Sequence, residues 1–140
     1  MSKYERTLVI LKPEVLERNL IGPIINHYED NNLKPIAMKM LKPSEEQMRE
    51  HYAEMKDKYS EEIINDIIKR MTRGNCIFII FEGINVIDRV RKINGATDPL
   101  KAEINTIRYK WAYNIKYNMV HGSDSSINAE REIDIWFPDF

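Results

Sequence analysis

The residues best suited to chemistry lie in one stretch, Asn118–Ser125, which reads Asn-Met-Val-His-Gly-Ser-Asp-Ser. Gly122 allows a tight turn directly after His121 and lets a ligand come close to the backbone. The serines and aspartate that follow are good helix N-caps, so a helix is expected to begin there with its positive end near the histidine. Such a terminus binds phosphate, and neutral imidazole is abundant at pH 7 and can act as a nucleophile. A histidine beside a glycine is more often an ordinary loop residue, so the rest of the chain must support this interpretation.

The chain has 140 residues and a net charge of −1, which predicts a single domain over residues 1–140 with its own core. The near-neutral charge predicts no general attraction to nucleic acid or anionic membranes. No apolar run is long enough to span a membrane, and the N-terminus lacks the apolar centre of a signal peptide. Cys76 is the single cysteine and suits a reducing compartment. We therefore expect a cytoplasmic protein with no membrane partner.

Runs of apolar and β-branched residues predict four strands, at residues 7–11, 36–41, 76–81 and 115–121. Lys12-Pro13 ends the first strand, because proline cannot donate to a strand ladder. Lys12 is thereby placed at a strand end and points beyond the sheet. A lysine at such a position is more often solvated than functional, so this placement alone assigns no role.

Helical periodicity and capping signals predict helices at 22–31, 44–52, 60–71, 86–94 and after Ser125. Ser44 and Gln47 have the spacing of a capping box, and Gly95 caps the fourth helix. Residues 96–113 show no strong period and read as a long loop. The order of elements lacks a regular strand–helix repeat. It favours an α+β fold, a ferredoxin-like sandwich in which helices cover a four-stranded antiparallel sheet.

Six short motifs occur in one order along the chain: Leu11-Lys12-Pro13, His51-Tyr52, Phe81-Glu82-Gly83-x-Asn85, Gly95-Ala96-Thr97-x-Pro99, Thr106-Ile107-Arg108 and Asn118-x-x-His121-Gly122-Ser123-Asp124-Ser125. With them, the chain resembles the nucleoside diphosphate kinases over almost its whole length. The resemblance implies transfer of the terminal phosphate of a nucleoside triphosphate, typically ATP, to a nucleoside diphosphate. It also implies a ping-pong route through a phosphohistidine at His121.

The resemblance also implies roles for individual side chains. Lys12, Arg91 and Arg108 match phosphate-binding residues, and Thr97 matches a hydroxyl donor to the phosphates. Tyr52 and Asn118 match residues that touch the phosphates and the sugar 3′-hydroxyl, and Ser123 and Glu132 match groups that hold the histidine ring. Mg²⁺ would bridge the nucleotide phosphates with no direct protein ligand, and Asp124 would lie nearby through water. His27 and His51 are expected to be structural.

Three segments depart from the family's pattern. The segment around residue 60 is longer by three residues, so either Tyr59 or Ile63 would contact the base. Tyr109 and the pair Ile104-Asn105 replace residues of the family's loop, and the path of that loop is therefore expected to change. Glu14-Val15 replaces an Asp-Gly pair, a change we expect to be tolerated. None of the three removes a residue that handles phosphate.

The leading hypothesis is an active kinase that assembles as a homo-oligomer, with a hexamer favoured over a tetramer by resemblance. The alternative is a catalytically weak nucleotide-binding or scaffolding module of the same fold. Because the chain has no tract rich in lysine and arginine, we expect no specific nucleic-acid binding.

Overall fold

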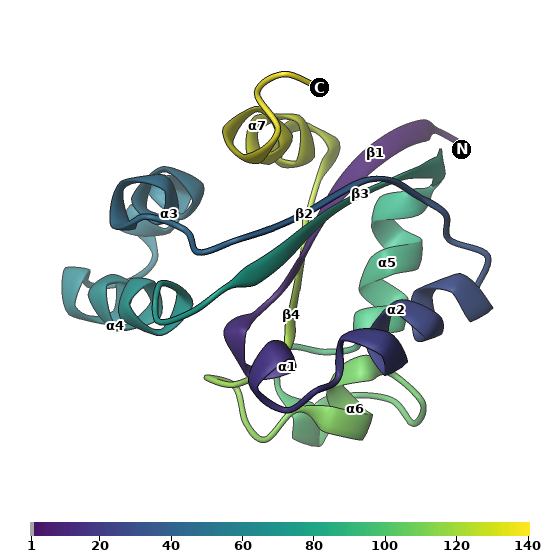
Figure 1. Cartoon of the computed structure of the whole chain (residues 1–140), viewed down its shortest axis with the longest axis horizontal. Helices are drawn as coiled ribbons and strands as arrows, with labels where there is room; N and C mark the ends of the chain where they lie inside the picture. Colours follow the sequence, from purple (N-terminus) through teal and green to yellow (C-terminus); the bar gives the residue numbers. More distant parts are fainter. Residues whose placement is uncertain (1) are drawn as a thin grey trace.

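Two long antiparallel strands form the centre of the sheet. In the computed structural model, which describes residues 2–140, the strands lie in the order β2 (Pro35–Leu41), β3 (Cys76–Ile84), β1 (Tyr4–Leu11) and β4 (Val120–Gly122). β1 pairs with β3 from Tyr4↔Ile84 to Leu11↔Ile77, and all neighbours in the sheet are antiparallel. The expected α+β sandwich with a four-stranded antiparallel sheet is confirmed (Figure 1).

Leu8–Leu11 of β1 and Cys76–Phe81 of β3 are apolar and buried, as expected for strands with both faces covered. Leu8 and Ile10 of β1 pack into the core on one face, and Val9 and Leu11 pack into a second core on the other. Polar side chains therefore collect at the ends of β1 and β4, where the chain turns away from the sheet.

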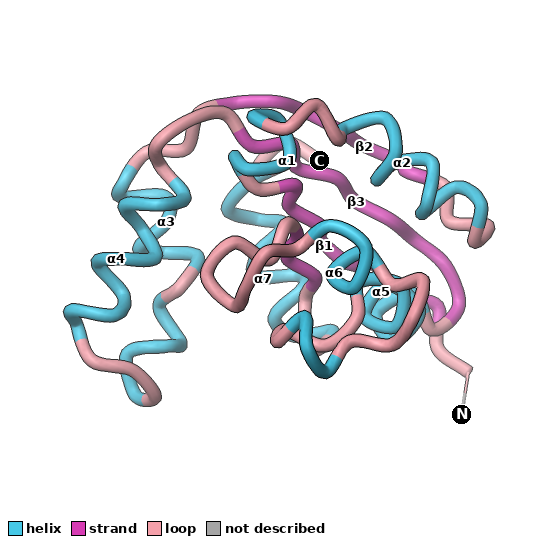
Figure 2. Tube along the Cα trace, turned by 90° about the horizontal axis from the view of Figure 1, so that it is seen from below, coloured by secondary structure: helices cyan, strands magenta, loops and turns pink. Residues whose placement is uncertain are grey.

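Helices cover both faces of the sheet (Figures 1 and 2). The first face is covered by α2 (Ile21–Asp30) and α5 (Val86–Asn94), with the short helices α1 (Pro13–Glu17) and α6 (Ile107–Trp111) beside them. The second is covered by α3 (Glu45–His51), α4 (Glu61–Met71) and α7 (Ser126–Trp136). Two short 3₁₀ helices, η1 (Ala53–Asp57) and η2 (Pro99–Lys101), complete the chain. No helix among residues 2–140 is long and apolar enough to cross a membrane.

The helix ends follow the predicted caps. Ser44 and Gln47 form the capping box of α3, with both hydrogen bonds at 3.0 Å. Ser125 caps α7 by accepting from the Asn128 backbone N–H. Gly95 ends α5 at φ +87°, and a Cβ there would lie 2.4 Å from Oγ1 of Thr106. Only glycine fits this position, because both the conformation and the space exclude a side chain.

The predicted strand at 115–121 is wrong in extent. β4 begins only at Val120, Ile115 is exposed, and Met119 has a left-handed φ of +78° that no strand residue adopts. The apolar residues of this segment line a cavity or lie in a buried turn. Their pattern in the sequence cannot be distinguished from that of a strand. Helices α1 and α6 were missed because each has five residues, too few to show a helical period.

Candidate active site

A cavity of about 950 Å³ opens between the α3–α4 pair on one side and the residues around β4 and the end of α5 on the other. This volume lies within the range of sites for small molecules and cofactors. The cavity brings together ten of the residues singled out in the sequence: Lys12, Tyr52, Ile63, Arg91, Thr97, Arg108, Asn118, His121, Asp124 and Glu132. Ser123 is fully buried behind His121 and does not line the cavity.

His121 is held from one side of its ring. β4 pairs His121 with Ile10 of β1, and α7 returns Glu132 to the ring, so that Nε2 of the histidine lies 3.0 Å from Oε1 of Glu132. Ser123 donates to the same carboxylate oxygen at 2.6 Å and accepts from the Leu8 backbone N–H at 3.1 Å. The ring orientation is therefore fixed by a carboxylate that is itself fixed by a serine and by strand β1.

The charge of Glu132 decides which ring nitrogen of His121 is free. Burial raises the pKa of Glu132, but the charge of His121 and its hydrogen bond outweigh this and hold that pKa at about 2. An ionised carboxylate only accepts hydrogen bonds, so in the neutral ring of His121 the proton is on Nε2 and the lone pair is on Nδ1. Nδ1 has no hydrogen-bond partner among residues 2–140. The arrangement thus presents an unprotonated ring nitrogen at a cavity wall.

A second histidine, His51, packs against the first. The two rings are nearly perpendicular, with their centroids 4.7 Å apart, and Trp136 donates from Nε1 to Nδ1 of His51 at 3.1 Å. Burial, followed by the charge of His121, lowers the pKa of His51 to about 3, so this ring is neutral. His51 was expected to be structural, and it does support α7 through Trp136. It also lines the cavity, which its isolated position in the sequence could not indicate.

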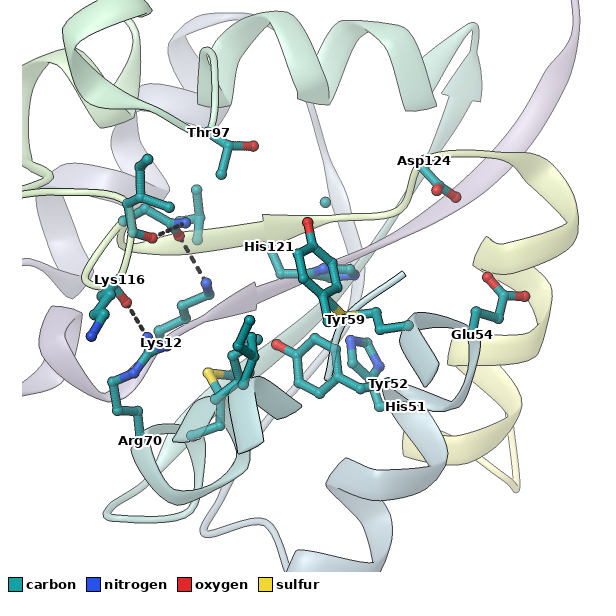
Figure 3. A pocket seen from close by; sticks show the side chains of 18 of the residues that line it. Lys12, His51, Tyr52, Glu54, Tyr59, Arg70, Thr97, Lys116, His121 and Asp124 are labelled. Atoms are coloured by element: carbon teal, nitrogen blue, oxygen red, sulfur yellow. Dashed lines mark hydrogen bonds between the residues drawn. The ribbon is translucent and has the colours of Figure 1, made fainter. Parts of the chain in front are cut away.

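Basic side chains line the cavity as well, and Figure 3 shows Lys12, Arg70 and Lys116 among them. Lys12 projects from the end of β1 and donates to Oδ1 of Asn118 at 2.8 Å. Burial lowers the pKa of Lys12 to about 8, although the charge of Glu14 opposes this shift. Arg91 and Thr97 line the cavity from α5 and the segment after it. The strand-end placement of Lys12 therefore does bring it to the site.

Arg108 has a structural task as well. Its guanidinium donates to the backbone carbonyls of Gly95, Asn118 and Val120, at 2.6, 3.3 and 2.7 Å. These bonds tie the end of α5 to the segment that leads into β4. Burial lowers the pKa of Arg108 to about 10, which still leaves it charged at neutral pH. The guanidinium group has five N–H donors, so some remain for a ligand.

The segment before His121 is held in a strained conformation. Met119 is buried with φ +78°; its carbonyl accepts from the Lys12 backbone N–H at 2.9 Å, and its N–H donates to Oε2 of Glu14 at 3.1 Å. A left-handed non-glycine residue costs about 1–3 kcal/mol, and the surrounding structure must supply that energy. Glu14, a position that departs from the family's pattern, is thus a buried anchor of the site.

Apolar side chains also line the cavity. Tyr59 and Ile63, the two candidates for contact with a base, are both among them. Ile115, which the sequence reading assigned to a strand, faces the same cavity. Figure 3 shows Asp124 and Glu54 on one side of the cavity, with Arg70 and Lys116 on the opposite side.

The carboxylates that line the cavity differ in their suitability as metal ligands. Among residues 2–140, one group has the composition of a metal site, His51, His121 and Glu132. It is rich in nitrogen, and Glu132 is already bonded to His121, whereas Mg²⁺ prefers oxygen ligands. Asp124 is different: it is exposed at the cavity edge, and Oδ1 accepts from Asn128 at 2.7 Å. These oxygen donors suit a magnesium ion that arrives with a phosphorylated ligand. They do not form a set of protein ligands that would hold the ion alone.

These features define a class of site. An oriented histidine with a free ring nitrogen faces lysine and arginine side chains in a cavity large enough for a nucleotide, which is the arrangement needed to transfer a phosphoryl group.

Comparison with known proteins agrees with this class. The family model described as nucleoside diphosphate kinase matches residues 5–140. A nucleoside diphosphate kinase of Clostridium perfringens is 44% identical over 136 residues, which is 97% of this chain and 93% of the relative. One of Symbiobacterium thermophilum is 43% identical, over 95% of this chain and 87% of the relative.

Among solved structures, the nucleoside-diphosphate kinase of Borrelia burgdorferi, a transition state mimic with bound vanadate and ADP, matches with a TM-score of 0.91 and 35% identity. The match covers 97% of this chain and 88% of that one. The apo enzyme of Encephalitozoon cuniculi matches with a TM-score of 0.89 and 31% identity, over 96% and 90% of the two chains. The chain belongs to the nucleoside diphosphate kinase family and is a phosphotransferase.

Proposed function

We propose that the chain transfers the terminal phosphate of a nucleoside triphosphate to a nucleoside diphosphate in two half-reactions, through a phosphohistidine at Nδ1 of His121. The observation that carries the proposal is the bond between Nε2 of His121 and the ionised Glu132, which leaves Nδ1 free in the cavity that the basic side chains line.

In the first half-reaction, the Nδ1 lone pair forms a bond to the terminal phosphorus. The bond from that phosphorus to the bridging oxygen breaks, and the nucleoside diphosphate leaves with the electron pair. Glu132 keeps its hydrogen bond to the ring and stabilises the positive charge that the ring acquires, while Ser123 holds Glu132 in place. A second nucleoside diphosphate then takes the phosphoryl group by the reverse of these steps.

The basic side chains have the complementary task. Because the transition state of phosphoryl transfer is loose and rich in charge, catalysis depends on positioned cations and donors more than on covalent chemistry. We assign this task to Lys12, Arg91 and Arg108, with Thr97 and Tyr52 as hydroxyl donors. Asn118, bonded to Lys12, is assigned to the sugar 3′-hydroxyl and the phosphates.

Mg²⁺ is proposed to enter with the nucleotide. When bound, the ion would offset the negative charge of the phosphates. The exposed carboxylate of Asp124 at the cavity edge is placed to contact it through water.

The base is proposed to contact either Tyr59 or Ile63, because both side chains line the cavity, as does the apolar Ile115. An aromatic face and aliphatic side chains pack against any base. Broad tolerance of base identity is therefore expected.

The chain is further proposed to be one domain over residues 1–140 that acts in the cytoplasm as a homo-oligomer, with a hexamer favoured over a tetramer. β2 is an edge strand whose Met38 and Met40 are exposed, and Ile104 and Tyr113 of the segment around α6 are exposed too. Unpaired edges and apolar side chains on a surface favour association. Native mass spectrometry counts the subunits.

Labelling tests the central step. The protein is incubated with terminally radiolabelled ATP and Mg²⁺ without an acceptor, next to His121→Ala and to His27→Ala as a histidine control outside the cavity. We expect acid-labile, base-stable label on the wild type and on the control but not on His121→Ala, and a nucleoside diphosphate should then chase that label into a triphosphate. A wild type that binds nucleotide but takes no label would refute the proposal and favour the weakly active binding module.

A further inference from the structure

A buried tyrosine and a buried asparagine meet beside the site without a task in the mechanism above. Asn94 is the last residue of α5 and is 1% exposed, and Tyr28 of α2 is fully buried. The Tyr28 hydroxyl donates to Oδ1 of Asn94 at 2.5 Å. Because burial raises the pKa of Tyr28, the hydroxyl keeps its proton and remains a donor. The carboxamide of Asn94 is therefore held by its oxygen.

The amide nitrogen of Asn94 lies close to Gly122, the residue that follows His121. Nδ2 of Asn94 lies only 2.8 Å from the place where a Cβ on Gly122 would stand, and Gly122 directly follows His121. Asn94, Gly122 and His121 line the same cavity. The glycine at 122 is thus needed for space: any side chain would displace the amide.

Nδ2 of Asn94 has no hydrogen-bond acceptor among residues 2–140, and it is not one of their buried unpaired atoms, so it is accessible from the cavity that Asn94 lines. A donor at a cavity wall bonds either to water or to an oxygen of a ligand. A ligand oxygen in the cavity can therefore accept from this group. In the sequence, Asn94 stands between Arg91 and Thr97, which are both assigned to phosphate.

We propose that the Asn94 carboxamide is a further phosphoryl-binding group, which donates from Nδ2 to an oxygen of the phosphoryl group transferred at His121, and that Tyr28 is its positioning residue. This inference rests on the proposed function, because it needs the phosphoryl group to be at His121. It adds a neutral donor to the basic side chains.

A purely structural role would explain the Tyr28–Asn94 bond as a tie between α2 and α5. The substitution Asn94→Asp separates the two roles. An aspartate keeps an oxygen that accepts from Tyr28, so the tie between the helices survives. It replaces the NH₂ group by an anionic oxygen, which repels a phosphoryl group.

The experiment compares wild type, Asn94→Asp, Asn94→Leu and Tyr28→Phe. For each protein it measures kcat/KM for phosphate transfer, the Kd of ADP alone, and inhibition by vanadate in the presence of ADP, with vanadate as the probe of the phosphoryl position. Concentrations are normalised to sites that bind ADP, so that unfolded molecules do not count. The labelling of wild type at His121 is run alongside.

The proposal expects kcat/KM to fall by about tenfold to a hundredfold in Asn94→Leu, as for the loss of one hydrogen bond to a charged group, and further in Asn94→Asp. Vanadate inhibition should weaken in the same order, and Tyr28→Phe should lie between wild type and Asn94→Leu. The Kd of ADP should stay within about twofold throughout.

Two results would overturn the inference in different ways. If the wild type is labelled at His121 but Asn94→Asp transfers phosphate and binds vanadate like wild type, the role of Asn94 is structural and the proposed function stands. If the wild type takes no label, the proposed function fails and this inference fails with it.

Discussion

Lys12 offers the most direct test of how the site is built, because its ammonium group is useful for catalysis and costly for folding. Its pKa falls from an ordinary 10.5 to about 8, with burial as the main cause. The unfolded chain therefore holds this proton more tightly than the folded chain does. Between the two pKa values the unfolded state binds more protons, so stability rises with pH through this window.

The magnitude follows from the shift. One pKa unit corresponds to about 1.4 kcal/mol, so at pH 7 the charged Lys12 lowers the free energy of unfolding by about 3 kcal/mol. At pH 9.5 the folded form is largely neutral at this group, and the same calculation leaves a penalty of about 1.5 kcal/mol. Lys12→Met, which keeps most of the length of the side chain without its charge, removes the penalty at every pH. It also removes the bond to Asn118, an offset that does not vary over this range.

We expect Lys12→Met to unfold at a higher urea concentration than wild type at pH 7, and the difference to shrink by about 1.5–2 kcal/mol between pH 7 and pH 9.5. The same variant should lose about a hundredfold to a thousandfold of kcat, since a donor to the developing charge is gone. Urea unfolding followed by tryptophan fluorescence measures the first effect, and a coupled assay the second. A variant whose stability difference from wild type does not change with pH would refute the argument.

Three further predictions follow from local contacts. Ser125→Ala removes the N-cap of α7 and should lower the free energy of unfolding by about 1 kcal/mol, measured in urea, with Ser125→Asp close to wild type. The pKa of His51 is lowered to about 3, so this side chain is neutral in the folded protein and charged in the acid-unfolded chain. The free energy of unfolding should therefore fall by about 2 kcal/mol between pH 7 and pH 5. His51→Gln, which keeps an acceptor for Trp136, should lack this fall, and an unchanged pH dependence in the variant would contradict the assignment. Tyr59→Ala should weaken ADP binding about tenfold by calorimetry if Tyr59 stacks on the base, whereas a larger loss in Ile63→Ala would assign the contact to Ile63.

The sequence alone determined the elements whose signals are local. The apolar runs of β1 and β3 and the caps at Ser44 and Ser125 depend on neighbouring residues, and the structure confirms them. The family followed from motifs in order. Short elements were beyond this kind of reasoning, because α1 and α6 have five residues each and β4 has three.

The residues of the site were predicted through the resemblance, and the fold brings ten of them to one cavity. Their arrangement came only from tertiary structure. Glu132 reaches His121 because α7 returns over the sheet, and this contact decides which ring nitrogen is free. Glu14 anchors Met119 across 105 positions of the chain. His51 and Asn94 enter the site by the packing of helices.

The difference between what the sequence and what the tertiary structure determined has one physical cause. Strand periodicity, helix caps and short motifs are set by residues a few positions apart, so they can be identified in the sequence by itself. Burial, hydrogen bonds between distant side chains and the resulting pKa values depend on which surfaces meet after folding. The sequence therefore determined the family and predicted candidate residues for its site, and only the tertiary structure decided which ring nitrogen of His121 is bonded to Glu132 and which buried groups surround it.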